Sequence, residues 1–345
     1  MPLTQAMPDV GGPAQPLLTV RGLTKHFPLK NGATVRAVDG VNFEVLKGET
    51  LGVVGESGCG KSTTARLLMH LMDPTQGELI FDGRSVGSRD LPLKEFRRQV
   101  QMVFQDSYAS LNPRLTIEDS IAFGPQVHGV SRKEAVARAH HLMDRVGLAP
   151  ARFAERYPHE LSGGQRQRIN IARALALQPR MVILDEAVSA LDKSVEAQVL
   201  NLLSDLKREF GLTYVFISHD LGVVNYISDR VMVMYLGQVA EIGPSDALFQ
   251  DPAHPYTKAL LSSVPSMDPS HRTQQAPLAG DPPNPINPPS GCRFHPRCPQ
   301  AAPVCAHKVP VITPVQLHHS ATCLVHEPGS GHPLAPSAGC IPLVA

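Results

Sequence analysis

The chain has 345 residues, enough for two domains or for one large domain with an appendage. Hydrophobic residues make up 42% and charged residues 18%, so a sizeable core is available. The net charge of +1 argues against a protein that binds nucleic acid through bulk charge, and the absence of any run of about 18 apolar residues excludes a predicted membrane-spanning helix.

The N-terminal segment, residues 1–16, is rich in Pro, Gly, Gln and Ala and lacks an apolar stretch. We therefore expect it to be disordered and not to be a secretory signal. The chain is accordingly predicted to be cytoplasmic, where thiols stay reduced.

Short apolar segments alternate with turns over the first hundred residues, and this pattern predicts strands. The expected strands are Leu17–Arg21, Val41–Val45, Thr50–Val54, Leu79–Gly83 and Gln101–Gln105.

A glycine-rich loop follows one of these strands directly. Residues Gly55–Thr63 read GESGCGKST and hold the pattern G-x-x-x-x-G-K-[ST], and good helix formers follow. In this context the backbone N–H groups cradle phosphate, the lysine reaches the β- and γ-phosphates and the serine hydroxyl lies on Mg²⁺. The predicted ATP contacts in this loop are Gly55, Glu56, Ser57, Gly58, Cys59, Gly60, Lys61, Ser62 and Thr63.

The sequence pattern predicts helices between Leu115 and Tyr157. Ser131 and Glu134 have the spacing of a capping box, and Gly147 lies just past the end of the predicted helix. We expect a helical insertion between two halves of an α/β domain.

A second predicted anion site lies at Leu161, Ser162, Gly163, Gly164 and Gln165, where a Ser-Gly-Gly turn opens a helix. The alternative is an ordinary glycine-containing N-cap.

The apolar run Met181–Asp185 predicts a buried strand that ends in an acidic pair, Asp185 and Glu186. An Asp at a strand end can hold Mg²⁺, and a neighbouring Glu can polarise an attacking water as a general base. The alternative is an acidic pair where a strand meets solvent. Further on, a helix ending at Gly211, a strand over Thr213–Ser218 and a hairpin over 231–242 continue a mostly parallel, helix-covered sheet.

Together, GESGCGKST, LSGGQ and ILDE resemble the nucleotide-binding subunits of ABC transporters, over about Leu17–Pro265. The resemblance implies an α/β fold, a P-loop NTPase (RecA-like) core with an antiparallel β subdomain and a helical insertion over about 106–165. It also implies ATP hydrolysis by two such domains paired head to tail, each ATP lying between the P-loop of one domain and the LSGGQ of the other.

The resemblance assigns the remaining site residues one by one. Phe27 matches the aromatic residue that stacks on adenine, and Gln105 the glutamine that senses Mg²⁺ and contacts the membrane subunits. His219 matches the switch histidine at the γ-phosphate, with Glu186 as the base. Mg²⁺ would be held through Ser62, Gln105 and Asp185. The loop that crosses the dimer interface is Ser189, Ala190, Leu191 and Asp192. The sequence departs from the family at Ala187, where proline is usual.

The C-terminal part begins with a Pro-rich stretch, residues 265–290, which we predict to be an extended linker. Residues 291–345 form a small extension with four clustered cysteines, Cys292, Cys298, Cys305 and Cys323. Four thiols in a short cytosolic segment favour a metal over disulfides, although their spacing is not that of paired CxxC zinc ligands. Cys59 and Cys340 lie apart from this group and are interpreted as incidental.

This tail, with His254-Pro-Tyr256 and Asn287–Cys292 before it, resembles the C-terminal extension of oligopeptide and dipeptide importer ATPases. Because some of these carry a [4Fe–4S] cluster, the resemblance implies an iron–sulfur site, with Zn²⁺ as the second choice and four free thiols as the alternative. His295, His307 and His319 rank below the cysteines as ligands.

The resemblance also implies partners. These are two membrane permeases, a second ATPase subunit that is a paralogue, and an extracytoplasmic solute-binding protein, with this chain peripheral on the cytoplasmic face of the inner membrane and no nucleic acid bound. The predicted function is to power import of dipeptides or oligopeptides, with glutathione, nickel chelates or another solute as alternative cargo. Less favoured alternatives are a soluble ABC ATPase acting on nucleic acid or the ribosome, and a nucleotide switch without turnover.

Overall fold

The computed structural model describes residues 16–263, 280–281 and 283–337. The segment predicted to be a disordered N-terminus lies outside these residues except for Pro16, and so does much of the predicted linker. The described end of that linker lies on the body of the protein, because the carbonyl of Pro285 accepts the N–H of Arg36.

An eight-stranded sheet runs through the molecule in the order β11-β12-β10-β9-β3-β8-β7-β6. Strands β9, β3, β8, β7 and β6 run parallel, and β10, β12 and β11 are added antiparallel at one edge. The strands are β3 (Thr50–Val54), β6 (Val100–Val103), β7 (Met181–Asp185), β8 (Thr213–Ile217), β9 (Arg230–Tyr235), β10 (Gln238–Pro244), β11 (Thr313–Gln316) and β12 (His319–Ala321). The predicted α/β class and the predicted hairpin are confirmed, whereas the strand expected over Gln101–Gln105 ends at Val103.

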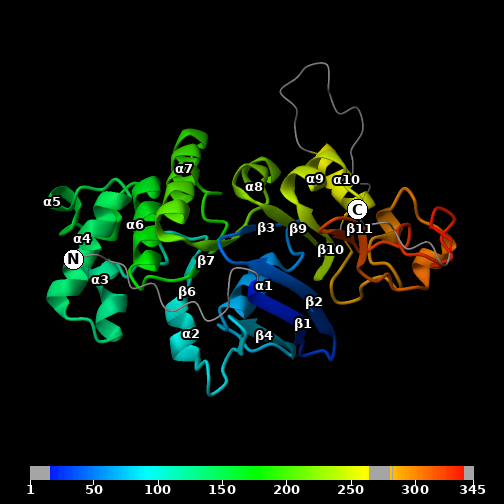
Figure 1. Ribbon diagram of the computed structural model, residues 1–345, viewed down its shortest axis with the longest axis horizontal. Coiled ribbons are helices and arrows are strands. Elements are labelled where there is room, and N and C mark those ends of the chain that lie inside the picture. The colour runs from blue at the N-terminus through cyan, green and yellow to red at the C-terminus, as the bar shows by residue number, and fades with distance from the viewer. Residues whose placement is uncertain (1–15, 264–279, 282, 338–345) are drawn as a thin grey trace.

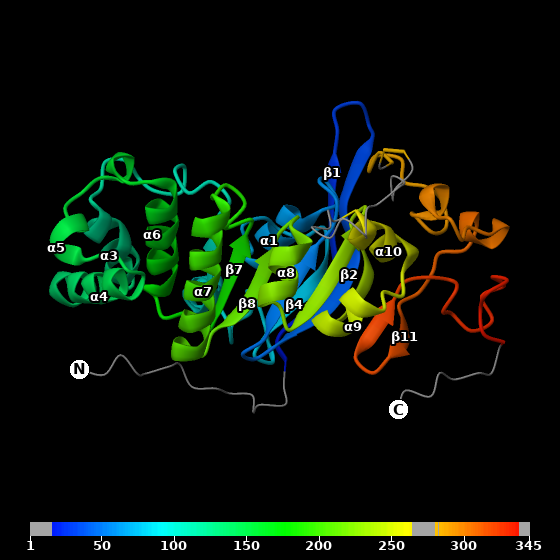
Figure 2. The same cartoon turned by 90° about the horizontal axis from the view of Figure 1, so that it is seen from above.

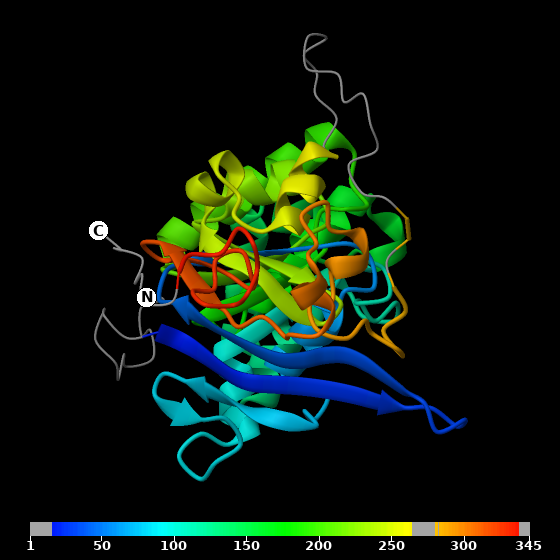
Figure 3. The same ribbon diagram turned by 90° about the vertical axis from the view of Figure 1, so that its right-hand side faces the viewer.

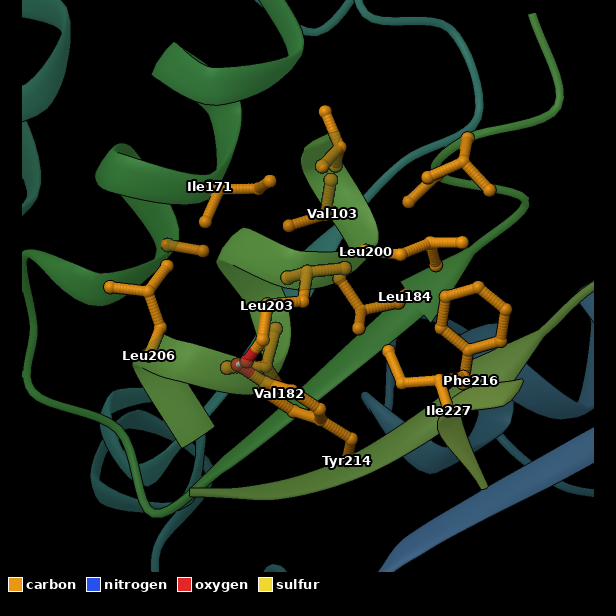
Figure 4. Close-up of a cluster of buried hydrophobic side chains, with 14 of the residues drawn as sticks. Val103, Ile171, Val182, Leu184, Leu200, Leu203, Leu206, Tyr214, Phe216 and Ile227 are labelled. Carbon is orange, nitrogen blue, oxygen red and sulfur yellow. Dashed lines mark hydrogen bonds between the residues drawn. The ribbon is translucent and has the colours of Figure 1, made fainter. Parts of the chain in front are cut away.

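The central strands are buried on both faces, which explains their continuous apolar sequence. In β7, Val182 and Leu184 belong to one core cluster, whereas Met181 and Ile183 belong to another on the opposite face. Figure 4 shows the first cluster, where side chains of the sheet meet those of the helices above it. The period-two alternation of strand side chains thus builds two cores from one run.

A second, antiparallel sheet covers the face of the central sheet that carries the second cluster (Figure 3). Its order is β2-β1-β4-β5, with β1 (Pro16–Pro28), β2 (Thr34–Leu46), β4 (Gln76–Phe81) and β5 (Arg84–Ser85). Two of its strands are longer than the sequence predicted. They form a long ribbon whose outer residues are partly exposed, so hydrophobicity marks only its buried half.

The helical insertion forms one end of the molecule, beside the parallel edge of the sheet (Figure 1). Ser131 caps its longest helix by accepting the N–H of Glu134, but the predicted capping box is only half formed, because the Glu134 carboxylate pairs with Arg138. The helices of this end are α3 (Ile117–Val127), α4 (Arg132–Arg145), α5 (Pro150–Phe153), η1 (Pro158–Glu160) and α6 (Gly163–Leu175).

The other helices cover the sheet or close its edges. They are α1 (Lys61–Leu68), α2 (Leu93–Gln99), α7 (Lys193–Phe210), α8 (Leu221–Ile227), α9 (Ser245–Gln250) and α10 (Pro255–Ser262). Among the described residues no helix combines the length and the hydropathy that crossing a bilayer requires.

The C-terminal extension lies at the end opposite the helical insertion (Figure 2). It contains η3 (His295–Arg297), η4 (Pro303–Ala306), β11 and β12. Strand β12 pairs with β10, and the fully buried His319 contacts the fully buried Glu241, with Nε2 and Oε1 2.7 Å apart. The extension is therefore part of the main sheet and not a separate appendage.

His254 gives the fold a pH-dependent element. The residue is 3% exposed, and its Nδ1 accepts the N–H of Tyr256 at 3.0 Å as the cap of α10. Burial lowers the pKa of His254 to about 4. Because the unfolded chain binds this proton near pH 6.5 and the folded chain does not, the stability that depends on neutral His254 falls as the pH drops from about 6.5 to about 4.

We predict that the titration of His254 lowers the unfolding free energy by about 3 kcal/mol as the pH falls across that range. Asn can cap the same helix without titrating. Thermal unfolding of the wild type and of His254→Asn is measured between pH 7 and pH 4.5. The melting temperatures of the two proteins, plotted against pH, should therefore converge toward low pH. Curves that stay parallel would contradict the prediction.

Candidate nucleotide-binding site

Three polar segments meet at the carboxyl edge of the parallel sheet. Gly55 follows β3, Asp185 ends β7, and His219 lies two residues after β8. Since β3, β8 and β7 are neighbours, these segments come together, as expected where ligands bind in open α/β sheets.

The loop Gly55–Thr63, the P-loop, needs glycine for steric reasons. Gly60 has φ +106°, and a Cβ on it would lie 2.2 Å from the carbonyl oxygen of Ala37. Gly55 has φ +150°, and its Cβ would lie 2.3 Å from the carbonyl oxygen of Met234. The loop is therefore wedged between β2 and β9 and leads directly into the N-terminus of α1.

Lys61 is held inside this loop. Its Nζ donates to the carbonyl oxygens of Gly55 at 2.7 Å and of Glu56 at 3.1 Å, and the residue is 5% exposed. A buried cation at a helix N-terminus attracts phosphate, so the arrangement suits a nucleotide.

Ser62 and Asp185 come together, with 3.1 Å between Ser62 Oγ and Asp185 Oδ1. Burial raises the pKa of Asp185, and the nearby Glu186 carboxylate raises it further, while the bond from Ser62 opposes both. A hydroxyl and a buried carboxylate are oxygen ligands of the kind that Mg²⁺ prefers, so these residues fit the predicted ion.

Glu186 lies between Gln105 and His219. Gln105 Nε2 donates to Glu186 Oε2 at 2.8 Å, and His219 Nδ1 lies 3.5 Å from the same oxygen. Glu186 also has φ +48°, a left-handed backbone that costs a non-glycine residue roughly 1–2 kcal/mol. Residues held in such conformations cluster at functional sites, and the three predicted catalytic side chains do meet here.

The signature motif, Leu161–Gln165, begins α6. Ser162 Oγ accepts the N–H of Gln165, and the Gln165 side chain accepts the N–H of Ser162 at 3.0 Å, which completes a capping box. The predicted interface loop packs beside it, since a Cβ on Gly163 would lie 4.0 Å from Leu191 Cδ2. Ser189 closes that loop by bonding to the carbonyl of Glu186, and Asp192 lies at the N-cap of α7.

The two motifs predicted to bind phosphate are not brought together within the chain. The P-loop leads into α1 under the sheet, whereas the signature motif opens α6 in the helical insertion, and the two helices lie apart along the long axis (Figures 1 and 2).

Phe27, the predicted adenine-stacking residue, lies near the end of β1 and is 36% exposed. The ammonium group of Lys25 is 5.3 Å from the centre of its ring. A partly exposed aromatic face is available for stacking, which a core residue would not offer.

Sequence reasoning missed two residues that hold the P-loop. The phenol oxygen of Tyr256 accepts the N–H of Glu56 at 2.9 Å, and Arg297 binds both oxygens of the Glu56 carboxylate. Both residues lie in stretches that carried the family resemblance, but no local pattern pairs them with a loop some 200 positions earlier.

The four cysteines of the extension do not form a metal site in the described residues, where no three His, Cys, Asp or Glu side chains are arranged to hold an ion. Cys292 and Cys305 are adjacent, with the N–H of Cys292 donating to the carbonyl of Cys305 at 2.8 Å. Burial raises the pKa of Cys292 to about 11 and of Cys323 to about 12, so these thiols are protonated at neutral pH. The donor types fit a soft metal, but the geometry gives the predicted cluster no support.

Comparisons with known proteins agree with this geometry. Residues 38–189 match the family described as ABC transporter, and residues 240–305 match the oligopeptide/dipeptide transporter C-terminal region. The chain is 52% identical to a probable peptide ABC transporter ATP-binding protein of Sinorhizobium fredii, covering 93% of both chains. It belongs to the ABC transporter ATPases.

Within this family the chain is also 49% identical to the oligopeptide transport ATP-binding protein AppF of Bacillus subtilis, over 89% of this chain and 96% of that one. Among solved structures, it resembles cbiO1 of Clostridium perfringens with a TM-score of 0.60 and 27% identity, over 68% of this chain and 91% of that chain. It also resembles the ATP-binding cassette MJ0796, solved as a dimer after hydrolysis with ADP and Pi, with a TM-score of 0.59 and 30% identity over 66% of this chain and 98% of that one. The predicted P-loop NTPase fold is thereby confirmed.

The signature helix depends on a close approach at Gly164, because a Cβ there would lie 2.6 Å from Val195 Cγ1 of α7. We predict that Gly164→Ala lowers the unfolding free energy of this ATPase by about 1–3 kcal/mol, despite the better helix propensity of alanine. Adding Gly164→Ala to a Val195→Ala background should instead be neutral or stabilising. Chemical denaturation of the wild type, the two single variants and the double variant tests this. A stabilising effect of Gly164→Ala in the wild-type background would refute it.

Proposed function

We propose that this chain is the ATP-hydrolysing subunit of an importer that carries peptides across a membrane. The observation that carries the proposal is the meeting of Lys61, the Ser62–Asp185 pair and the Gln105–Glu186–His219 group at one edge of the sheet. The peptide cargo follows from the names of the two relatives and from the match to the oligopeptide/dipeptide transporter region.

The site residues suggest how the reaction proceeds. Lys61 and the N–H groups at the start of α1 would bind the phosphates, and Ser62 with Asp185 would hold Mg²⁺, which neutralises developing charge. Glu186, fixed between Gln105 and His219, would orient the attacking water and accept its proton. His219 lies at the edge of this group with its side chain 60% exposed, which suits a contact with the γ-phosphate.

The separation of the two phosphate-binding motifs supports a paired ATPase. A signature motif that lies far from the P-loop of its own chain can serve the nucleotide of a second subunit, and MJ0796 was solved as a dimer. We propose a second ATPase subunit, two membrane permeases and a solute-binding protein on the far side, with this chain peripheral on the cytoplasmic face of the membrane. The interface loop Ser189–Asp192, packed against the signature turn, would lie at the joint between the two ATPases.

We also propose the domain division that the sequence predicts: an ATPase domain over residues 17–264, with its helical part over about 106–165, then a linker to residue 290 and the extension beyond. The extension would remain one structural unit with the ATPase domain, since β12 pairs with β10.

The test of this function uses Glu186→Gln, which keeps the size of the side chain but replaces the carboxylate base with an amide. We predict that ATPase activity falls by about 100-fold or more while nucleotide binding persists, and that the bound state is trapped as a closed ATPase pair. Glu134→Gln, at an exposed ion pair on α4, is the matched control.

The same pair of variants tests the cargo in cells. Uptake of labelled dipeptides and oligopeptides should collapse with Glu186→Gln and persist with Glu134→Gln. Unchanged peptide uptake beside a lost ATPase would reject peptides in favour of glutathione, nickel chelates or another solute. An unchanged ATPase rate would overturn the role of Glu186.

For the extension we propose that the four cysteines bind a [4Fe–4S] cluster, because four thiols are a soft donor set suited to iron–sulfur chemistry and, less well, to Zn²⁺. We predict about four iron and four sulfide per chain after anaerobic purification, and a loss of both in Cys305→Ser. Cys59→Ser is the control, since that thiol lies in the P-loop. Zinc without sulfide, or six titratable thiols per chain, would refute the cluster.

A further inference from the structure

An arginine of the C-terminal extension reaches the P-loop. Arg297 ends η3, and its side chain is 5% exposed. Its two terminal nitrogens lie 2.8 Å and 3.0 Å from the two carboxylate oxygens of Glu56. This is the paired-fork geometry of a strong, oriented arginine–carboxylate contact.

Glu56 is the second residue of the P-loop, and its main chain is held as well. Its carbonyl accepts from Lys61 Nζ at 3.1 Å, and its N–H donates to Tyr256. Glu56, whose side chain pairs with Arg297, therefore also helps to hold Lys61 through its main-chain carbonyl.

A second arginine of the extension reaches the other end of the site. Arg293 pairs with Asp39 and also donates to the carbonyl of Leu236. Asp39 is shared with His26, whose Nε2 lies 2.9 Å away and which directly precedes Phe27. The extension thus contacts the protein beside both the phosphate end and the predicted adenine end.

Charge gives the Arg297 contact a function beyond attachment. A nucleotide brings several negative charges to the P-loop, and an unpaired Glu56 carboxylate on the same loop would repel them. Arg297 neutralises this carboxylate while fixing its direction.

We propose that Arg297 is a positioning residue for nucleotide binding, which makes the C-terminal extension a constituent of the ATP site. Arg297 acts through Glu56 and does not itself touch the nucleotide. The inference rests on the proposed nucleotide site and goes beyond it, because it assigns the extension a part in ATP affinity.

The test measures binding of a fluorescent N-methylanthraniloyl-ADP with Mg²⁺ to the purified full-length chain. We expect Arg297→Ala to weaken binding about tenfold, because Glu56 is left charged and unpaired. Adding Glu56→Gln to Arg297→Ala should recover most of that affinity, since the repelling charge is gone. Arg297→Lys, which keeps the positive charge, should lie close to the wild type.

The rescue separates positioning from mere attachment. If Arg297 only fastened the extension, removing Glu56 as well could not restore affinity, and the double variant would bind as weakly as Arg297→Ala. That result, or wild-type affinity in a folded Arg297→Ala, would overturn the inference. If Arg297→Ala fails to fold, Arg297→Gln and Arg297→Gln/Glu56→Gln take the place of the two variants, and the inference again predicts weakened binding in the first and recovery in the second.

The matched control is Arg180→Ala. Arg180 pairs with Asp82 at 2.8 Å with similar burial, but it precedes β7 and therefore lies at the amino edge of the sheet, away from the P-loop. It should lower the melting temperature without changing the affinity for the probe. Failure of the wild type itself to bind the probe would count against the proposed function, whereas tight wild-type binding without any effect of Arg297 would count against this inference alone.

Discussion

The direction of the parallel strands is the constraint on which the site depends. Strands β3, β8 and β7 are adjacent and point the same way, so their carboxyl ends deliver the P-loop, His219 and the Asp185–Glu186 pair to one edge. Both faces of these strands are buried in the two cores. The predicted catalytic side chains therefore follow strands that are packed on both faces, which suits the fixed positions that their proposed roles require.

Much of this arrangement could be predicted from local sequence. The P-loop pattern, the strand ending in Asp185 and the Ser-Gly-Gly turn before α6 each combine a backbone requirement with a polar group, and such signals are readable over a dozen residues. The strand limits of β1 and β2 were less readable, because half of that ribbon faces solvent and has no apolar alternation to mark it. The capping box predicted at Ser131 formed only in part, because the Glu134 carboxylate pairs with Arg138.

What could not be predicted are contacts made by tertiary structure alone. Glu56 and Arg297 are 241 positions apart, and nothing in either local sequence names its partner. The buried contact between Glu241 and His319 could not be predicted either, because each residue is a single polar position within a strand and nothing nearby indicates its partner. Burying one member of such a pair alone is costly. The pairs therefore depend on the extension lying against the rest of the chain.

The pairing of β12 with β10 also changes what the outer rim of the sheet presents to other molecules. Strand β10 is buried along most of its length and rich in apolar residues, and without β12 its N–H and C=O groups would form an open, hydrophobic rim that could recruit strands from other chains. The strand now at the rim, β11, is only four residues long and contains Pro314, which has no N–H to offer a further strand. The extension thus ends the sheet on a short strand that offers fewer hydrogen-bonding groups to a further strand.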